Sequence, residues 1–220
     1  TLSCYTMATG IIRNGRRNHI LIKTITCARW GTLYSAFQVE RLYAECRAWI
    51  DFEEFHVFTD QPQQYHPDIH VHQIPKTDAY RSWWSKMLQF KTFTQGTTLS
   101  LDIDMHIRDR VELQFSKDYL LMQLDPLAQF HPHKNIKYVN SSVIAYDGDF
   151  SWVHDKYFAD WRNIQQRYRG DQEFMWGEYW NNIRYHPPVF ESYKWEARAR
   201  GYALLPMVNY HGADVKGAVG

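Results

Sequence analysis

The most informative stretch of this chain is Leu-Ser-Leu-Asp-Ile-Asp-Met-His-Ile, residues Leu99 to Ile107. Apolar and polar side chains alternate along it, which predicts a strand with one buried face. Aspartate is disfavoured in strands, so Asp102 and Asp104 on the polar face require an explanation. Carboxylates two residues apart on a strand lie roughly 7 Å apart and repel each other unless a cation lies between them. The stretch therefore predicts a site for Mn²⁺ or Mg²⁺, which take oxygen ligands, or else an edge strand whose outer face is only hydrated.

Composition places the chain among ordinary globular proteins. It has 220 residues, of which 45% are hydrophobic and 22% charged, and we expect one domain over residues 1–220. The aromatic content of 16% is high and suits either a Trp-rich core or stacking surfaces for sugars and bases. A net charge of +1 gives no global attraction to nucleic acid.

The three cysteines, Cys4, Cys27 and Cys46, are odd in number and lack C-x-x-C spacing. We therefore expect neither a disulfide framework nor a zinc site, and a reducing, cytoplasmic location. No apolar run approaches the ~20 residues that span a bilayer, so we expect no transmembrane segment.

The pattern of elements predicts an α/β fold. Ser35 and Gln38 form a capping box that opens a helix, and Gly170 ends a long later one. The expected strands are 20–27, 55–58, 69–74, 99–107, 119–124, 136–146 and 188–192, and the expected helices are 35–50, 83–93, 153–168 and 171–180. Residues 1–19 form an expected N-terminal hairpin extension around a basic Asn-Gly turn. This order favours a mostly parallel sheet flanked by helices, with the ligand beyond the carboxyl ends of the strands.

Several segments, in sequence order, resemble the GT-A glycosyltransferases, in particular the retaining, metal-dependent group that includes glycogenin and bacterial galactosyltransferases. They are also similar to short phage and bacterial transferases. The matching segments are Ala28-Arg29-Trp30-Gly31, Phe58-Thr59-Asp60, Trp83-Trp84-Ser85-Lys86, Leu101-Asp102-Ile103-Asp104, Asn140-Ser141-Ser142-Val143, Gly170-Asp171-Gln172, and more weakly Tyr193-Lys194 with Tyr210-His211-Gly212 and Lys216. The resemblance implies a single Rossmann-like GT-A domain whose tail, 193–220, closes the donor site.

The resemblance also implies a metal-assisted reaction. Departure of a nucleoside diphosphate builds negative charge on its β-phosphate, and a divalent cation held by Asp102 and Asp104 would neutralise that charge. His211 matches the third metal ligand of the family, and Mn²⁺ accepts imidazole more readily than Mg²⁺ does. The alternative for His211 is a surface histidine before a glycine turn.

Further residues match the donor-binding positions of the family. Ala28, Trp30 and Asp60 are candidates for the nucleotide pocket, which Asp102 also borders. Lys86 and Lys216 would offer positive charge to the donor diphosphate. The alternatives are a turn aspartate for Asp60 and solvated lysines for Lys86 and Lys216, the last of which departs from the spacing usual after the family's histidine.

Three residues match the family's catalytic positions. Asn140 corresponds to an asparagine near the donor sugar, where an amide binds hydroxyls. Asp171 and Gln172 correspond to the pair that faces the reacting sugar carbon, where a carboxylate stabilises an oxocarbenium-like transition state or bonds the sugar. The alternatives are an asparagine that only bends a strand, and a Gly170-Asp171 pair that only ends one helix and caps the next.

The expected function is transfer of a sugar from a UDP-sugar to a hydroxyl acceptor. The acceptor is either a glycan or lipid-linked sugar, or a 5-hydroxymethylpyrimidine in phage-type DNA, which the scattered arginines would suit. A rival is a nucleotidyltransferase, which normally has a Gly-rich phosphate loop after its first strand, and Ala28 to Gly31 is not one. A second rival is a non-catalytic module that binds sugar or nucleic acid.

Overall fold

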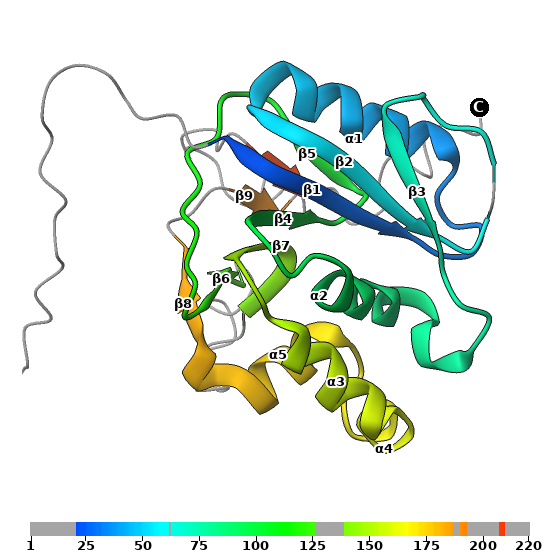
Figure 1. Cartoon of the computed structure of the whole chain (residues 1–220), viewed down its shortest axis with the longest axis vertical. Coiled ribbons are helices and arrows are strands. Elements are labelled where there is room, and N and C mark those ends of the chain that lie inside the picture. The colour runs from blue at the N-terminus through cyan, green and yellow to red at the C-terminus, as the bar shows by residue number, and fades with distance from the viewer. Residues whose placement is uncertain (1–20, 62, 126–138, 187–189, 193–206, 210–220) are drawn as a thin grey trace, which may run out of the picture.

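A mixed seven-stranded sheet forms the centre of the protein, which we analysed as a computed structural model. The structure describes residues 21–61, 63–125, 139–186, 190–192 and 207–209. The strand order is β3-β2-β1-β4-β7-β6-β8 (Figure 1). The strands are β1 (Ile22–Arg29), β2 (Phe52–Thr59), β3 (Ile69–Gln73), β4 (Thr97–Leu101), β6 (Leu120–Leu124), β7 (Val139–Asp147) and β8 (Ile183–Tyr185). Only the β4–β7 and β6–β7 pairs are antiparallel, so the predicted mostly parallel α/β sheet is confirmed.

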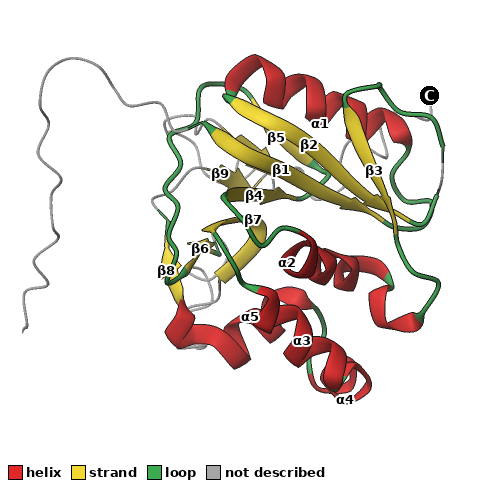
Figure 2. Cartoon of the chain, viewed as in Figure 1, coloured by secondary structure: helices red, strands yellow, loops and turns green. Residues whose placement is uncertain are grey.

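Helices cover both faces of this sheet, as Figure 2 shows. Helix α1 (Ala36–Trp49) packs on one face, and α2 (Leu88–Thr92), α3 (Ser151–Ala159) and α5 (Asp171–Tyr179) pack on the other. The predicted capping box at the start of α1 is present. Of its predicted apolar stripe, Trp49 is 40% exposed and lies outside the core.

The predicted strand over 99–107 is wrong in one respect: it is interrupted at the two aspartates. β4 ends at Leu101, and Met105 N–H donates to Asp102 O at 3.1 Å, closing a turn. β5 (Met105–Ile107) then leaves the main sheet and pairs with β10 (Met207–Asn209), which pairs with β9 (Phe190–Ser192). The carboxylates therefore lie on a turn and not along one face of a strand.

The predicted long helix over 153–168 is also divided. α3 ends at Ala159 and α4 (Trp161–Arg167) begins two residues later, because Asp160 leaves the helical conformation with φ −138°. Asn163 Nδ2 donates to the Asp160 carboxylate at 2.6 Å, the kind of local bond by which aspartate competes with a helix. The apolar stripe is nevertheless kept across the break.

A run of tight helical turns connects β3 to β4. The 3-10 helices η1 (Asp78–Tyr80) and η2 (Ser82–Met87) precede α2, where the sequence predicts a single helix over 83–93. The expected hairpin at 1–19 and most of the expected closing tail at 193–220 lie outside the described residues. Within the described ranges, no helix has the length and apolar character needed to cross a membrane.

Candidate active site

Several of the residues singled out in the sequence meet at the carboxyl end of β4. Asp102 follows this strand, Lys86 lies in η2, and Asp171 begins α5. β7, the antiparallel neighbour of β4, contributes Asn140, the second residue of the strand. The structure thus brings together segments separated by as many as 85 positions, which the order of motifs alone does not establish.

A buried ammonium group joins two of these segments. Lys86 Nζ lies 2.5 Å from Asp102 Oδ1 and 3.2 Å from Asp171 Oδ2. It also donates to the backbone oxygen and the hydroxyl of Ser141, each at 3.3 Å. Burial alone would lower the pKa of Lys86, but the charges and hydrogen bonds of Asp102 and Asp171 raise it above its ordinary value. Lys86 is therefore a fixed cation and not a solvated helix lysine.

A β-bulge in β7 builds the floor of the site. Gln123 pairs with Asn140 and Met122 pairs with Ile144, so three residues of β7 are left over between these pairs. Bulges re-aim side chains near functional sites. Here Ser142 Oγ donates to Asp102 Oδ2 at 2.7 Å, and Asp102 N–H donates to Ser142 O at 2.9 Å.

The second aspartate, Asp104, is also partly buried. Burial and the neighbouring charge of Asp102 raise the pKa of Asp104 to about 6, although the hydroxyl of Tyr34 and the charge of Lys86 oppose the rise. Tyr34 Oη donates to Asp104 Oδ2 at 3.0 Å. Arg29 holds Tyr34 in turn, because its Nε donates to Tyr34 O at 2.7 Å. Two carboxyl groups therefore lie at the end of β4, close enough for the charge of Asp102 to raise the pKa of Asp104. Such a pair suits a bound cation.

The oxygen donors of this turn fit Mn²⁺ or Mg²⁺. Within the residues that the structure describes, no group of three His, Cys, Asp or Glu side chains is placed to hold a metal. His211, the expected third ligand, lies outside those residues, as does Lys216. The described residues nearest to His211 in sequence are those of β10, which ends at Asn209. Asn209 pairs with Met105, the residue after Asp104.

Helix α1 fixes the backbone of the aspartate turn. Arg41 donates to Ile103 O through Nη2 and to Met105 O through Nη1, both at 3.0 Å. Arg41 is itself paired with Glu45 at 3.0 Å, and Glu45 Oε2 accepts from Ile107 N–H at 2.9 Å. Their spacing of four residues signals a helical ion pair, but nothing in the sequence indicates that this pair contacts the turn.

Two of the three expected catalytic side chains are linked to the bulge. Asp171 is 5% exposed and lies at the start of α5. Gln172 Oε1 accepts from Ser141 N–H at 3.4 Å, and its Nε2 donates to Asp125 at 3.0 Å. Asn140 Oδ1 accepts from Ser142 N–H at 2.8 Å, so its side chain supports the bulge.

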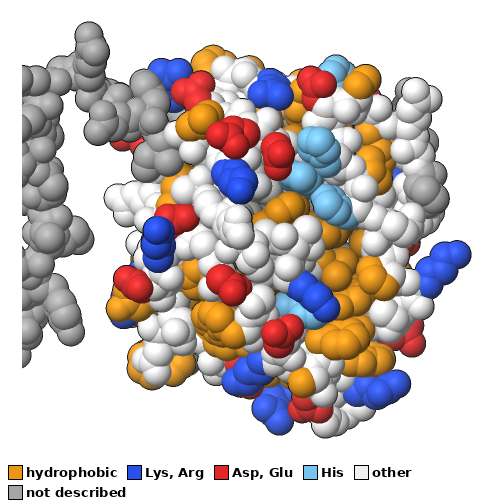
Figure 3. All heavy atoms as spheres, viewed as in Figure 1, with side chains coloured by type: hydrophobic (Ala, Val, Ile, Leu, Met, Phe, Trp, Pro, Cys, Tyr) orange, Lys and Arg blue, Asp and Glu red, His pale blue; other side chains and the backbone are white. Residues whose placement is uncertain are grey.

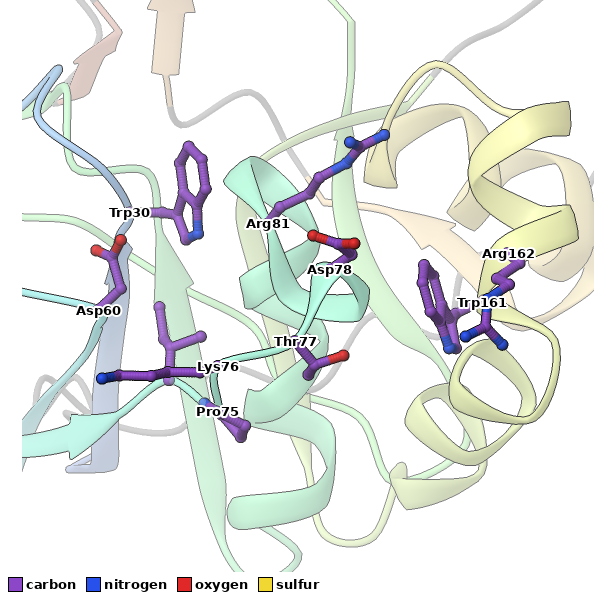
Figure 4. A pocket seen from close by; sticks show the side chains of 10 residues that line it. Trp30, Asp60, Pro75, Lys76, Thr77, Asp78, Arg81, Trp161 and Arg162 are labelled. Atoms are coloured by element: carbon purple, nitrogen blue, oxygen red, sulfur yellow. The ribbon is translucent and has the colours of Figure 1, made fainter.

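The expected nucleotide-binding residues lie around the end of β1. Ala28 is half-buried, and Trp30 is 41% exposed. Both carboxylate oxygens of Asp60 accept from Gly31 N–H, at 2.9 and 3.1 Å. Gly31 has φ +67°, a conformation that favours glycine. Asp60 therefore stabilises the turn after β1, the alternative named from sequence, while it also lines a pocket with Trp30 (Figure 4).

Sequence reasoning missed Tyr34, Arg41 and Ser142 as site residues. Ser142 stands within a segment that carries the family resemblance, so that segment already contained the signal. Tyr34 precedes α1 and Arg41 lies within it, and their contacts with the aspartate turn depend on the packing of α1 beside β5, which only the structure reveals.

No protein-family model and no curated protein matches this chain. Solved structures do match this chain. The galactosyltransferase LgtC, in complex with donor and acceptor sugar analogues, aligns with TM-score 0.59 over 89% of this chain and 95% of its own, at 13% identity. An active-site mutant of LgtC aligns with TM-score 0.60 over the same shares. The glycosyltransferase GlyE of Streptococcus pneumoniae TIGR4 aligns with TM-score 0.60 over 86% of this chain and 55% of its own, at 10% identity.

These likenesses define the class of the fold. The chain has the Rossmann-like α/β fold of these glycosyltransferases, and the aspartate turn, Lys86 and Asp171 lie at the carboxyl end of its parallel strands, where such sheets bind ligands.

Proposed function

We propose that this protein is a metal-dependent glycosyltransferase that moves a sugar from a UDP-sugar to a hydroxyl acceptor, with retention of configuration. The observation that carries the proposal is the ammonium of Lys86 between Asp102 and Asp171. A lysine shared by an aspartate turn and a second buried aspartate, at the ligand-binding edge of this fold, suits cleavage of a diphosphate-linked sugar.

The proposed reaction exchanges one bond for another. To retain configuration, the acceptor oxygen bonds the anomeric carbon on the face from which the diphosphate leaves. The bond from that carbon to the β-phosphate oxygen breaks, and the hydroxyl proton passes to the departing diphosphate or to solvent. Mn²⁺ or Mg²⁺, held by Asp102, Asp104 and His211, would supply positive charge toward the departing diphosphate.

The residues of the chain itself have separate proposed roles. Lys86 and Lys216 bind the diphosphate, and Ala28, Trp30 and Asp60 border the nucleotide. Asp171 stabilises the positive charge that develops on the sugar ring, and Gln172 and Asn140 bind its hydroxyls. Lys86 holds Asp171 close to Asp102, since its ammonium contacts both carboxylates at once.

The solved structures support a sugar as the acceptor. LgtC is described with donor and acceptor sugar analogues, and GlyE is also described as a glycosyltransferase. We therefore propose a glycan or lipid-linked sugar in preference to a hydroxymethylated DNA base, which these likenesses do not support.

Slow hydrolysis of the donor tests the proposal without knowledge of the acceptor. The protein is incubated with a panel of UDP-sugars, with Mn²⁺ or with EDTA, and free UDP is measured. We expect UDP from one donor, only with metal, and a loss of about a hundredfold or more in Asp171→Asn. Asp118→Asn, at an exposed position outside the site, is the matched control.

Two outcomes contradict the proposal. Release of pyrophosphate from UTP and a sugar 1-phosphate, with no release of UDP from any UDP-sugar, identifies a nucleotidyltransferase. Binding of the nucleotide sugar with no turnover of any donor, and with affinity unchanged in Asp104→Ala, identifies a non-catalytic binding module.

A further inference from the structure

A pocket of about 530 Å³ extends from the expected nucleotide-binding residues Trp30 and Asp60. This volume falls in the range of small-molecule sites in proteins, about 300–1,000 Å³. One wall is the turn after β1 and β2, the second is the segment from β3 to η2, and the third is the start of α4 (Figure 4). Its lining residues are Trp30, Asp60, Ile74, Pro75, Lys76, Thr77, Asp78, Arg81, Trp161 and Arg162.

The pocket is positively charged. Lys76, Arg81 and Arg162 line it together with Asp60 and Asp78. Asp60 is already engaged, because both of its oxygens accept from Gly31 N–H. Among the residues that the structure describes, the charged groups of Lys76 and Arg81 have no hydrogen-bond or ion-pair partner. Cations that face a pocket without protein partners favour an anionic ligand.

Two indole rings border the same space from opposite sides. Trp30 lies on the β1 side and is 41% exposed, while Trp161 lies on α4. The guanidinium of Arg162 lies 4.5 Å from the centre of the Trp161 ring, which holds a cation and an aromatic face side by side. An indole offers a flat apolar surface with one polar group, and such surfaces suit the faces of a sugar ring.

The pocket is connected to the candidate active site through short, constrained segments. Arg81 precedes Ser82, which has the left-handed φ of 55°, and Ser85 Oγ donates to Ser82 O at 2.7 Å. This turn leads directly into η2 and Lys86. Trp83, in the same turn, packs against Gly170, the neighbour of Asp171. The segments that line the pocket therefore also position both partners of the buried ion pair.

We propose that this pocket is the acceptor subsite and that it selects a sugar acceptor carrying an anionic group, a phosphate or a carboxylate. The anion binds between Arg81, Arg162 and Lys76, and the sugar ring packs on Trp161. This inference rests on the proposed function, because an acceptor subsite presupposes a transfer reaction.

Direct binding to the full chain, with UDP and Mn²⁺ present to fill the donor site, tests the inference. Four probes are titrated by calorimetry: glucose 6-phosphate, glucuronate, methyl glucoside and inorganic phosphate. We expect glucose 6-phosphate or glucuronate to bind about tenfold more tightly than methyl glucoside and than inorganic phosphate, since only they offer both groups. The tighter of the two identifies the anion.

Charge-removing variants locate the binding. Arg81→Gln combined with Arg162→Gln is expected to abolish the preference for the anionic sugar, and Lys76→Gln, from another part of the wall, to reduce it about threefold. Donor hydrolysis is expected to stay within twofold of wild type in both. Lys91→Gln combined with Lys117→Gln removes the same charge at exposed positions outside the pocket and is expected to change nothing.

Three results overturn the inference while leaving the proposed function intact if UDP is still released. They are equal affinity for all probes, a preference that survives the pocket variants, and binding of glucose 6-phosphate only when UDP is left out. The inference is also overturned if a duplex oligonucleotide binds more tightly than the sugars and this binding is lost in the same variants. Absence of UDP release from every donor refutes the proposed function itself, whatever the probes do.

Discussion

Lys86 Nζ lies 3.2 Å from Asp171 Oδ2, across an interface between η2 and the first turn of α5. The same nitrogen lies 2.5 Å from Asp102. One buried cation therefore balances two carboxylates from two other segments. A cation in this position serves stability and function together, because each carboxylate would be buried beside the other without it.

Lys86→Met is expected to be strongly destabilising. The substitution keeps most of the side-chain volume but leaves Asp102 and Asp171 without their shared cation, so we expect a loss of about 3 kcal/mol in the free energy of unfolding. Urea unfolding at pH 7 measures it. Lys91→Met, at an exposed position of α2, should cost less than about 0.5 kcal/mol, and an equally small cost for Lys86→Met would contradict the assignment.

Gly170→Ala tests the contact between the pocket segment and Asp171. A Cβ at this position would lie 3.0 Å from Trp83 Nε1, so the indole or the helix start has to shift by a few tenths of an ångström. We expect donor turnover to fall about fivefold to tenfold, with a stability loss of about 1 kcal/mol.

The double variant Gly170→Ala with Trp83→Ala supplies the control, because it removes the atom that the new Cβ would meet. Its turnover should match that of Trp83→Ala alone. If Gly170→Ala lowers turnover equally in the presence and absence of the Trp83 ring, the contact is not the cause.

Tyr34→Phe is expected to weaken metal binding. The hydroxyl donates to Asp104 Oδ2, and this bond favours the charged, metal-binding form of the carboxylate. We expect the affinity for Mn²⁺, measured by calorimetry with UDP present, to fall about tenfold. Tyr185→Phe, at a largely exposed position outside the site, should leave it unchanged.

Stability is expected to fall in mild acid because of a histidine cluster outside the site. His56 Nδ1 lies 2.9 Å from His72 Nε2, and the rings of His56 and His70 stack at 4.8 Å. Figure 3 shows histidine side chains gathered close together on the face of the protein that is turned toward the viewer. Burial lowers the pKa of His56 to about 4, aided by the two neighbouring histidines and opposed by Glu54.

The direction of this pH effect on stability follows from the lowered pKa of His56. The unfolded chain binds a proton below pH 6.5 and the folded chain only below about 4, so folding loses stability as the pH falls through this window. The loss attributable to His56 is at most about 3 kcal/mol. Urea unfolding at pH 7 and pH 5 should show a smaller difference in His56→Phe than in wild type. The control is His66→Gln, because that side chain is half exposed and should retain the wild-type difference.

Much of the fold is predictable from local patterns, and the failures have local causes. The capping box at Ser35 correctly opens α1, and Gly170 correctly separates two helices. The alternation over 99–107 does not reveal the turn. Leu101, Ile103 and Met105 are buried in the observed turn, as they would be in a continuous strand. The short strands β8 and β10 carry too few residues to show a period, and their pairing partners are distant in sequence.

The candidate site is predictable only as a set of residues. Motif order selects Lys86, Asp102 and Asp171, and the structure places Lys86 in contact with both aspartates. The bulge at Ser142 depends on register between β6 and β7, and the support from Arg41 depends on how α1 packs beside β5. Register and packing are properties of the folded chain, and no short motif contains them.

The central claim is that Asp102 and Asp104 hold a metal ion beside the diphosphate of the donor. The most direct test is anomalous diffraction from crystals of the full chain grown with MnCl₂ and UDP. We expect one strong manganese peak within about 2.0–2.3 Å of carboxylate oxygens of Asp102 and Asp104, and also bound to phosphate oxygens of UDP. UDP bound without such a peak, or a peak that lies away from both aspartates, would contradict the account.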